Sequence, residues 1–177
     1  MNSLPPVVYF RKPEPVDLDS LYKQKNDPEV RRRLGGFSHP LSKKDMEDWL
    51  ESHRKRTDEV LWSIMDRASD RCLGHVGIYR VDPVSSSAEL GIMIGFKEAW
   101  GKGIGRFAVL HAIEYAFGSM NLNRISLTVL ATNERAIRLY TGLGFILEGT
   151  LRQAHYSEGA YVDIIAMGLL RKEFHGE

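Results

Sequence analysis

A glycine-rich segment, EAWGKGIGR at residues 98–106, joins an apolar stretch to a long helical pattern and limits the folds that the chain can adopt. Glycines spaced by two let main-chain N–H groups turn inward, and a helix that begins there directs its unpaired N–H groups at the same point. Helix N-termini attract anions, by roughly 0.3–1 kcal/mol per charge at exposed sites. The segment therefore predicts a phosphate-binding loop. Its residues are Gly101, Lys102, Gly103, Ile104, Gly105 and Arg106.

The hydrophobic pattern around this segment predicts the order β-α-α-α-β-β-β-α-β-α-β-β. Residues 103–118 carry an apolar face at helical spacing, and residues 124–130 form a nearly unbroken apolar strand. A further helix is expected to start at Thr132 or Asn133 and to stop at Gly144. We expect an α/β fold in one domain, residues 1–177, with a mixed, mostly antiparallel sheet of six or seven strands flanked by helices.

Composition points away from nucleic acid and membranes as partners. The 24 basic and 23 acidic side chains leave a formal net charge of +1. Cys72, the single cysteine, cannot form an internal disulfide and suits a reducing compartment. No stretch has the pattern of a signal peptide or the length of a membrane span. We therefore expect a cytoplasmic protein.

Two classes of phosphate-binding protein fit the spacing of this loop poorly. In a P-loop NTPase the second glycine, counted from Gly95, falls on Trp100, and Lys102 is followed by a glycine instead of a hydroxyl residue. The dinucleotide fingerprint G-x-G-x-x-G/A is met by GIGRFA at residues 103–108, but FKEAWGK separates it from the preceding strand and three helices come before it. The spacing excludes a P-loop NTPase, and a dinucleotide-binding protein stays as a remote alternative.

The third candidate ligand of the loop is the pyrophosphate of coenzyme A. AELGIMIGFKEAWGKGIGRFAVLHAIEYAF, followed by NERAIRLYTGLGFILEGTLRQAHYSEGAYVDIIAMGLL, resembles the GNAT superfamily of N-acetyltransferases, and within it the ribosomal-protein and polyamine acetyltransferase branch. The resemblance covers about residues 60–171. The family loop R/Q-x-x-G-x-G/A is matched at Gly103 and Gly105, with Trp100 in place of Arg or Gln.

This resemblance implies an acetyl-CoA-dependent N-acetyltransferase with a GNAT fold and no metal. The pyrophosphate would lie on the glycine loop, and the pantetheine between the strands that contain Ile92 and Leu127, which would splay apart. The resemblance also allows a homodimer. The cofactor-binding residues that it implies, besides those of the loop, are Ile92, Met93 and Ile94 through their main chains, and Asn133.

Transfer of an acetyl group to an amine requires an acid for the departing thiol and a base for the amine. Tyr140 lies two helical turns after Asn133 on the same face, and the resemblance gives it the role of acid; spacing alone also fits an apolar stripe. Glu89 is the candidate base, on a strand that alternates it with apolar residues, although a cross-strand ion pair is the alternative. Rival bases are His39, His75 and His155, and Asp163 is a further candidate for binding the amine.

The acceptor is a primary amine of open identity. Polyamine-acetylating members carry consecutive acidic residues between their first helices, whereas this chain has GGFSHPLS there, with Ser38 and His39 in their place. A polyamine, an amino sugar or other small amine, and a protein amino group all stay open. A different class of function is also open: a non-catalytic sensor or subunit that binds acyl-CoA.

Overall fold

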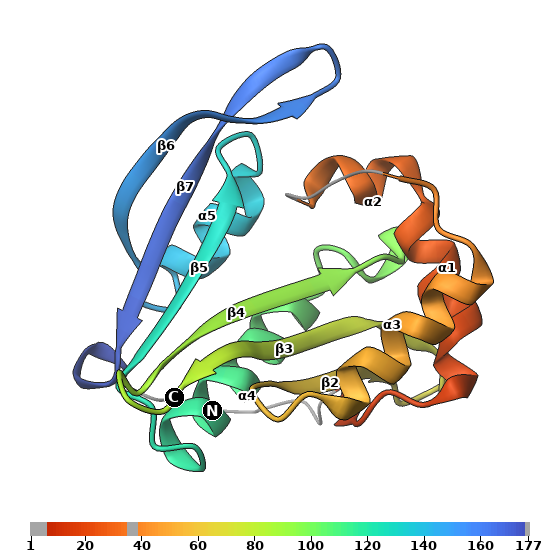
Figure 1. Cartoon of the computed structure of the whole chain (residues 1–177), viewed down its shortest axis with the longest axis horizontal. Coiled ribbons are helices and arrows are strands. Elements are labelled where there is room, and N and C mark those ends of the chain that lie inside the picture. The colour runs from red at the N-terminus through yellow and green to blue at the C-terminus, as the bar shows by residue number, and fades with distance from the viewer. Residues whose placement is uncertain (1–6, 35–38, 176–177) are drawn as a thin grey trace.

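A seven-stranded sheet runs through the whole protein in the order β1-β2-β3-β4-β5-β7-β6 (Figure 1). The computed structural model describes residues 7–34 and 39–175. All neighbouring strands are antiparallel except β4 and β5, which are parallel. The sheet thus confirms the mixed, mostly antiparallel fold expected from the sequence. The strands are β1 (Val8–Arg11), β2 (Val60–Asp66), β3 (Cys72–Asp82), β4 (Ser87–Ile94), β5 (Arg124–Leu130), β6 (Ile146–Ser157) and β7 (Ala160–Leu170).

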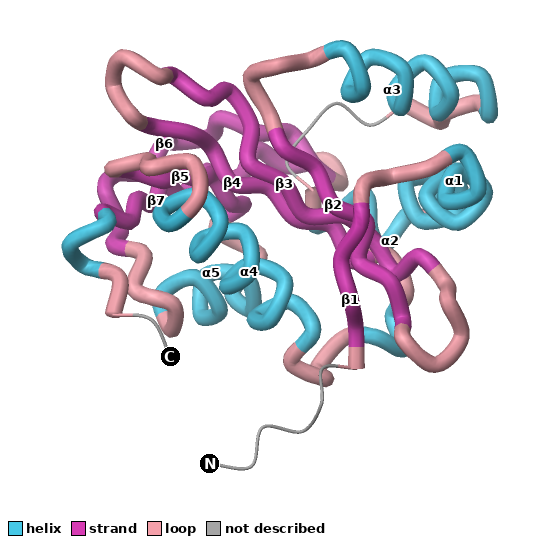
Figure 2. Tube along the Cα trace, turned by 90° about the horizontal axis from the view of Figure 1, so that it is seen from below, coloured by secondary structure: helices cyan, strands magenta, loops and turns pink. Residues whose placement is uncertain are grey.

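Helices cover both faces of the sheet, which gives a three-layer arrangement (Figure 2). The larger core cluster packs the apolar face of α4 against β2, β3, β4 and β5, and a smaller cluster joins α1 and α3 to the opposite face. No helix in the described part of the chain is long and apolar enough to cross a membrane. The helices are α1 (Leu18–Asn26), α2 (Pro28–Arg33), α3 (Lys43–Lys55), α4 (Ile104–Gly118) and α5 (Glu134–Thr141).

The helix that follows β5 starts and stops at residues that the sequence predicts. Asn133 is its N-cap, as expected, and its side chain accepts a hydrogen bond from the Ala136 N–H. Its last helical residue is Thr141, and Gly144 follows just beyond it with a φ of 94°. The Gly144 N–H donates to the Thr141 carbonyl and the Phe145 N–H to the Tyr140 carbonyl, both at 3.0 Å, so Gly144 is the left-handed glycine that terminates the helix, as the sequence predicts.

A buried glutamine holds the end of β4 against α1. The Gln24 amide donates to the Cys72 carbonyl at 2.9 Å, and its oxygen accepts from the Gly95 N–H at 3.1 Å. A Cβ added at Gly95 would lie 2.2 Å from the Gln24 Cβ, so the close approach of these two segments requires glycine at residue 95. This contact fixes where β4 ends and where the glycine-rich segment starts.

β4 and β5 stay together over only three residue pairs, from Ser87 with Arg124 to Glu89 with Ser126. Beyond Glu89 the two strands diverge (Figure 1). The splay expected between the strands of Ile92 and Leu127 is confirmed. Because strand pairing stops there, alternate main-chain N–H and C=O groups of β4 face an open cleft on the β5 side.

Candidate active site

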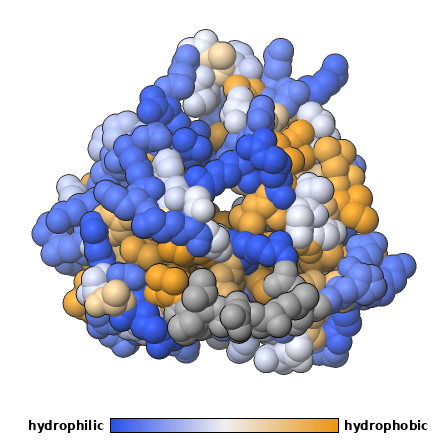
Figure 3. Space-filling model, turned by 180° about the vertical axis from the view of Figure 1, so that it is seen from behind, coloured by the Kyte–Doolittle hydropathy of each residue, from blue (hydrophilic) through white to orange (hydrophobic). Residues whose placement is uncertain are grey.

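The diverging strands form the sides of a cleft of about 540 Å³. The glycine-rich segment, the start of α4, one face of α5 and the end of α2 complete its walls. Seen from behind, the molecule is hollowed near its centre, and hydrophilic residues surround much of the opening (Figure 3). Apart from the rival bases and Asp163, every predicted site residue except Lys102 lines the cleft: Glu89, Ile92, Met93, Ile94, Gly101, Gly103, Ile104, Gly105, Arg106, Asn133 and Tyr140.

The glycine loop has the backbone shape that an anion site needs. Gly101 and Gly103 adopt φ values of 81° and 78°, in the left-handed region that favours glycine, and Gly103 is the N-cap of α4. The N–H groups of Ile104 and Gly105 lie in the first helical turn and have no intrahelical partner. Such a loop can present main-chain donors to a phosphate.

The third loop glycine, Gly105, is required neither by conformation nor by packing. A Cβ added at Gly105 would lie 3.5 Å from Leu139 Cδ2, an ordinary contact distance, and the φ of Gly105 is not positive. Only the first two glycines are therefore required by conformation.

Trp100 takes the place of the Arg or Gln of the family loop pattern and packs at the end of β4. Its indole N–H donates to the Ile94 carbonyl at 2.8 Å, and the Arg33 guanidinium lies 4.6 Å from the ring centroid. Trp100 thus joins the loop to β4 and to α2. A carbonyl oxygen has two lone pairs, so the Ile94 carbonyl can still accept a second hydrogen bond.

Tyr140 is buried at the side of the cleft, with 7% of its surface exposed. Its ring packs edge-on against Phe145, and within the described chain its hydroxyl has no hydrogen-bond partner. Burial raises the pKa of Tyr140 to about 12, because the apolar surroundings disfavour the phenolate. The hydroxyl is therefore protonated at neutral pH and available to a group in the cleft.

Asn133 links two elements across the cleft. Besides capping α5, its amide donates to the Arg33 carbonyl at the end of α2, at 3.3 Å. Near the same opening, Arg32 of α2 forms an ion pair with Glu158 at 2.8 Å, between β6 and β7. The mouth of the cleft is thus bounded by α2 on one side and by the C-terminal hairpin on the other.

Glu89 forms the cross-strand ion pair that the sequence left as an alternative. The Arg80 guanidinium lies 2.8 Å from its carboxylate, and both side chains are exposed. Arg80 sits in a β-bulge with a φ of 51°, and this irregularity turns its side chain toward Glu89. Glu89 nevertheless lines the cleft at the last β4–β5 residue pair, so both roles meet in one residue.

The rival bases lie elsewhere. His75 packs under Trp49 and beside Tyr79, and burial, with Lys25 and His53 nearby, lowers its pKa to about 3. Such an imidazole is too weakly basic to collect a proton from an ammonium at neutral pH.

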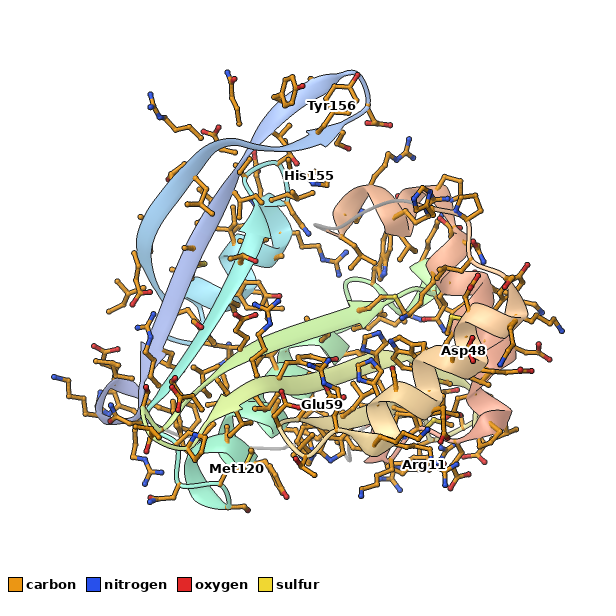
Figure 4. All side chains as sticks on the ribbon, in the orientation of Figure 1. Arg11, Asp48, Glu59, Met120, His155 and Tyr156 are labelled. Atoms are coloured by element: carbon orange, nitrogen blue, oxygen red, sulfur yellow. The ribbon has the colours of Figure 1, made fainter. Side chains whose placement is uncertain are left out.

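The remaining candidates contribute little to the cleft. Asp163 accepts a hydrogen bond from the Gln153 N–H and so stabilises a bulge in β6. His155 lies near the tip of the β6–β7 hairpin, beside Tyr156 (Figure 4). His39 is exposed and does not line the cleft, and Ser38 lies outside the described residues.

Two arginines of the cleft wall were not predicted from the sequence. Arg33 reaches it from α2, and Arg135 reaches it from the first turn of α5. The sequence signal for Arg135 is its place two residues after Asn133, but Arg138 on the same helix is an equally ordinary helical arginine. Only the packing of α5 against the loop distinguishes them.

Comparison with known proteins agrees with this fold and cleft. The family model described as an acetyltransferase (GNAT) domain matches residues 8–146. Uncharacterized N-acetyltransferase p20 of Bacillus licheniformis is 32% identical over 94% of each chain. Spermidine N(1)-acetyltransferase of Vibrio cholerae is 32% identical over 78% of this chain and 79% of its own. The crystal structure of spermidine N-acetyltransferase from Vibrio cholerae in complex with CoA and spermine superposes with a TM-score of 0.87, at 26% identity over 94% and 97% of the two chains.

The chain therefore belongs to the GNAT family of acetyltransferases. It is an acetyl-CoA-dependent N-acetyltransferase, as the resemblance in its sequence implied. The cleft suits this donor, since it combines a strand edge open to main-chain hydrogen bonds, a glycine loop at a helix start and a protonated phenol.

Proposed function

We propose that this enzyme transfers the acetyl group directly to a primary amine, with Tyr140 as the general acid and Glu89 as the general base. The observation that carries this proposal is the Tyr140 side chain, which is buried in the same cleft as the glycine loop and has a protonated hydroxyl without a protein partner in the described chain. A structural tyrosine buried to this degree usually has its hydroxyl hydrogen-bonded to the protein.

The residues that would hold the donor follow from the cleft. Main-chain groups of Ile92 and Ile94 are available to an extended amide chain, because β5 does not pair with them, whereas those of Met93 point the other way and pair with β3. The loop N–H groups would meet the pyrophosphate. Asn133 retains one amide hydrogen and one oxygen lone pair beyond its contacts with Ala136 and Arg33.

When bound, acetyl-CoA supplies a reactive thioester whose sulfur leaves more easily as a thiol than as a thiolate. Tyr140 provides that proton. The amine loses its proton to Glu89, directly or through water, as the N–C bond forms and the C–S bond breaks. The exposure of Glu89 and Arg80 keeps their ion pair weak, so a cationic amine can compete for the carboxylate.

The proposed acceptor class is a primary amine, which polyamines, amino sugars and protein amino groups share. The spermidine acetyltransferases among the relatives support a polyamine. The loop that would carry the acidic residues of a polyamine site has none in its sequence GGFSHPLS, which supports the other acceptors. The competing function, a non-catalytic acyl-CoA sensor, shares the donor site and differs only in turnover.

Substitution of Tyr140 by Phe tests the proposal. Release of CoA thiol is followed with spermidine, aminoglycosides and lysine-containing peptides as acceptors. We expect kcat to fall by roughly 10²–10⁴-fold with unchanged binding of acetyl-CoA, because the acid is lost and the ring is retained. Tyr115→Phe is the matched control, since Tyr115 is exposed on α4 and packs on Trp62. Unchanged kcat in Tyr140→Phe would remove the assigned acid, and no turnover by the wild type would favour the sensor.

A further inference from the structure

Arg135 brings a cation to the glycine loop from the opposite side of the cleft. It is exposed on the first turn of α5 and lines the cleft together with the loop. Its Nη2 atom lies 4.0 Å from the position that a Cβ of Gly101 would occupy. The guanidinium therefore lies beside the residue at which the loop first enters the left-handed conformation.

The other arginines near the cleft are engaged with protein groups. Arg33 pairs with Glu29 and covers Trp100, and Arg106 donates to the Gly142 carbonyl at 3.0 Å. Arg138, on the same helix, pairs with Glu134 at 3.0 Å. Arg135, by contrast, has no ion pair or hydrogen bond with any residue that the structure describes. A cation that lines a cleft without a protein partner retains all its donors for a ligand.

We propose that Arg135 is a specificity-determining residue that binds the pyrophosphate of acetyl-CoA from the side opposite the glycine loop. This inference rests on the proposed position of the pyrophosphate at that loop. A pyrophosphate carries two negative charges, and main-chain N–H groups at one helix start balance only part of them. A guanidinium adds a full charge and two parallel donors that match phosphate oxygens. The loop and Arg135 thus form the two sides of one phosphate clamp.

The test compares three acetyl donors that differ in their phosphates. Acetyl-CoA carries a pyrophosphate and a 3′-phosphate, acetyl-dephospho-CoA carries the pyrophosphate alone, and S-acetylpantetheine carries neither. In Arg135→Gln we expect KM for the first two donors to rise by about 10- to 100-fold, the effect of losing one charge-assisted hydrogen bond, with kcat unchanged. The kinetics with S-acetylpantetheine should not change.

Two variants serve as controls. Arg138→Gln removes the same charge from α5, but at a residue that pairs with Glu134, and should change KM by less than about twofold. Arg135→Lys keeps the charge and loses the paired donors, so it should recover part of the lost affinity. If Arg135→Gln is too unstable to assay, Arg135→Lys decides: wild-type KM for both CoA donors would then overturn the proposal.

Other outcomes would also overturn it. An effect confined to acetyl-CoA would assign Arg135 to the 3′-phosphate, and an equal effect on S-acetylpantetheine would give it a structural role. No effect with any donor would leave it without a ligand. Calorimetric titration with CoA and dephospho-CoA gives the same comparison without turnover. A failure of catalysis is therefore distinguishable from a failure of the clamp.

Discussion

His75 is a titratable residue that the fold keeps neutral. Its ring lies near side chains of α1, α3 and β3. The ring centroid of Trp49 is 5.4 Å away, and the Tyr79 hydroxyl is 3.5 Å from its Nδ1. Lys25 lies 4.0 Å from the Trp49 ring centroid, and His53 contacts the carboxylate of Glu59. Burial, with Lys25 and His53 nearby, disfavours a charge on His75 and lowers its pKa.

This environment makes the stability of the protein depend on pH. The pKa of His75 is about 3 in the folded state against 6.5 for a free side chain, so the unfolded chain binds the proton first as the pH falls. The neutral His75 side chain makes its full contribution to the free energy of unfolding above pH 6.5. This contribution is lost as the pH falls toward 3, by at most about 1.4 kcal/mol per pH unit. His75→Gln should therefore flatten the decrease in the free energy of unfolding between pH 6.5 and 4, measured by urea denaturation. The exposed His39→Gln is the control. An unchanged pH slope in His75→Gln would contradict the assignment.

At the level of elements, two glycines of the loop differ in whether the backbone requires glycine: Gly103 has a positive φ and Gly105 does not. A Cβ at Gly103 would meet nothing within 4 Å, so the cost of Gly103→Ala is the left-handed backbone alone. We expect a loss of about 1–2 kcal/mol in the free energy of unfolding, and weaker binding of acetyl-CoA because the loop relaxes. Gly105→Ala, inside the helix, should be neutral or stabilising by up to about 1 kcal/mol. Thermal denaturation and titration with CoA measure both. Equal destabilisation by the two substitutions would contradict this distinction.

The same elements mark what the sequence could predict. The order of helices and strands followed from periodicity, and Asn133, one of the two expected helix starts, is the N-cap because its side chain satisfies a local N–H group. The contact between Arg80 and Glu89 was not predictable in detail, because it depends on a bulge with a positive φ at a residue that is not glycine. The place of Arg135 in the cleft wall was not predicted for a similar reason. Local spacing fixes a residue's helix face, whereas the neighbour on that face is fixed by tertiary packing.

At the scale of the whole molecule, the two halves of the sheet are joined by a short seam. β1 to β4 form one antiparallel unit and β5, β7 and β6 form the other, with only the pairs from Ser87–Arg124 to Glu89–Ser126 between them. The core under α4 holds the halves together from behind. A donor bound in the cleft would extend the hydrogen bonding of β4 beyond this seam, in the place that another strand would take.

This arrangement predicts a local pattern of hydrogen exchange when acetyl-CoA binds. Alternate amides of β4 between Leu90 and Ile94 face the cleft, and they should exchange at least about tenfold more slowly with donor bound, since they then have partners. At 100 Kd the donor also stabilises the folded state by about 2.7 kcal/mol, which slows globally exchanging amides throughout the chain. Amides shared between β2 and β3 report that global effect and are the internal control. NAD at the same concentration should protect neither set. Protection that is uniform across the sheet, or absent from β4, would show that the donor does not pair with the open strand edge.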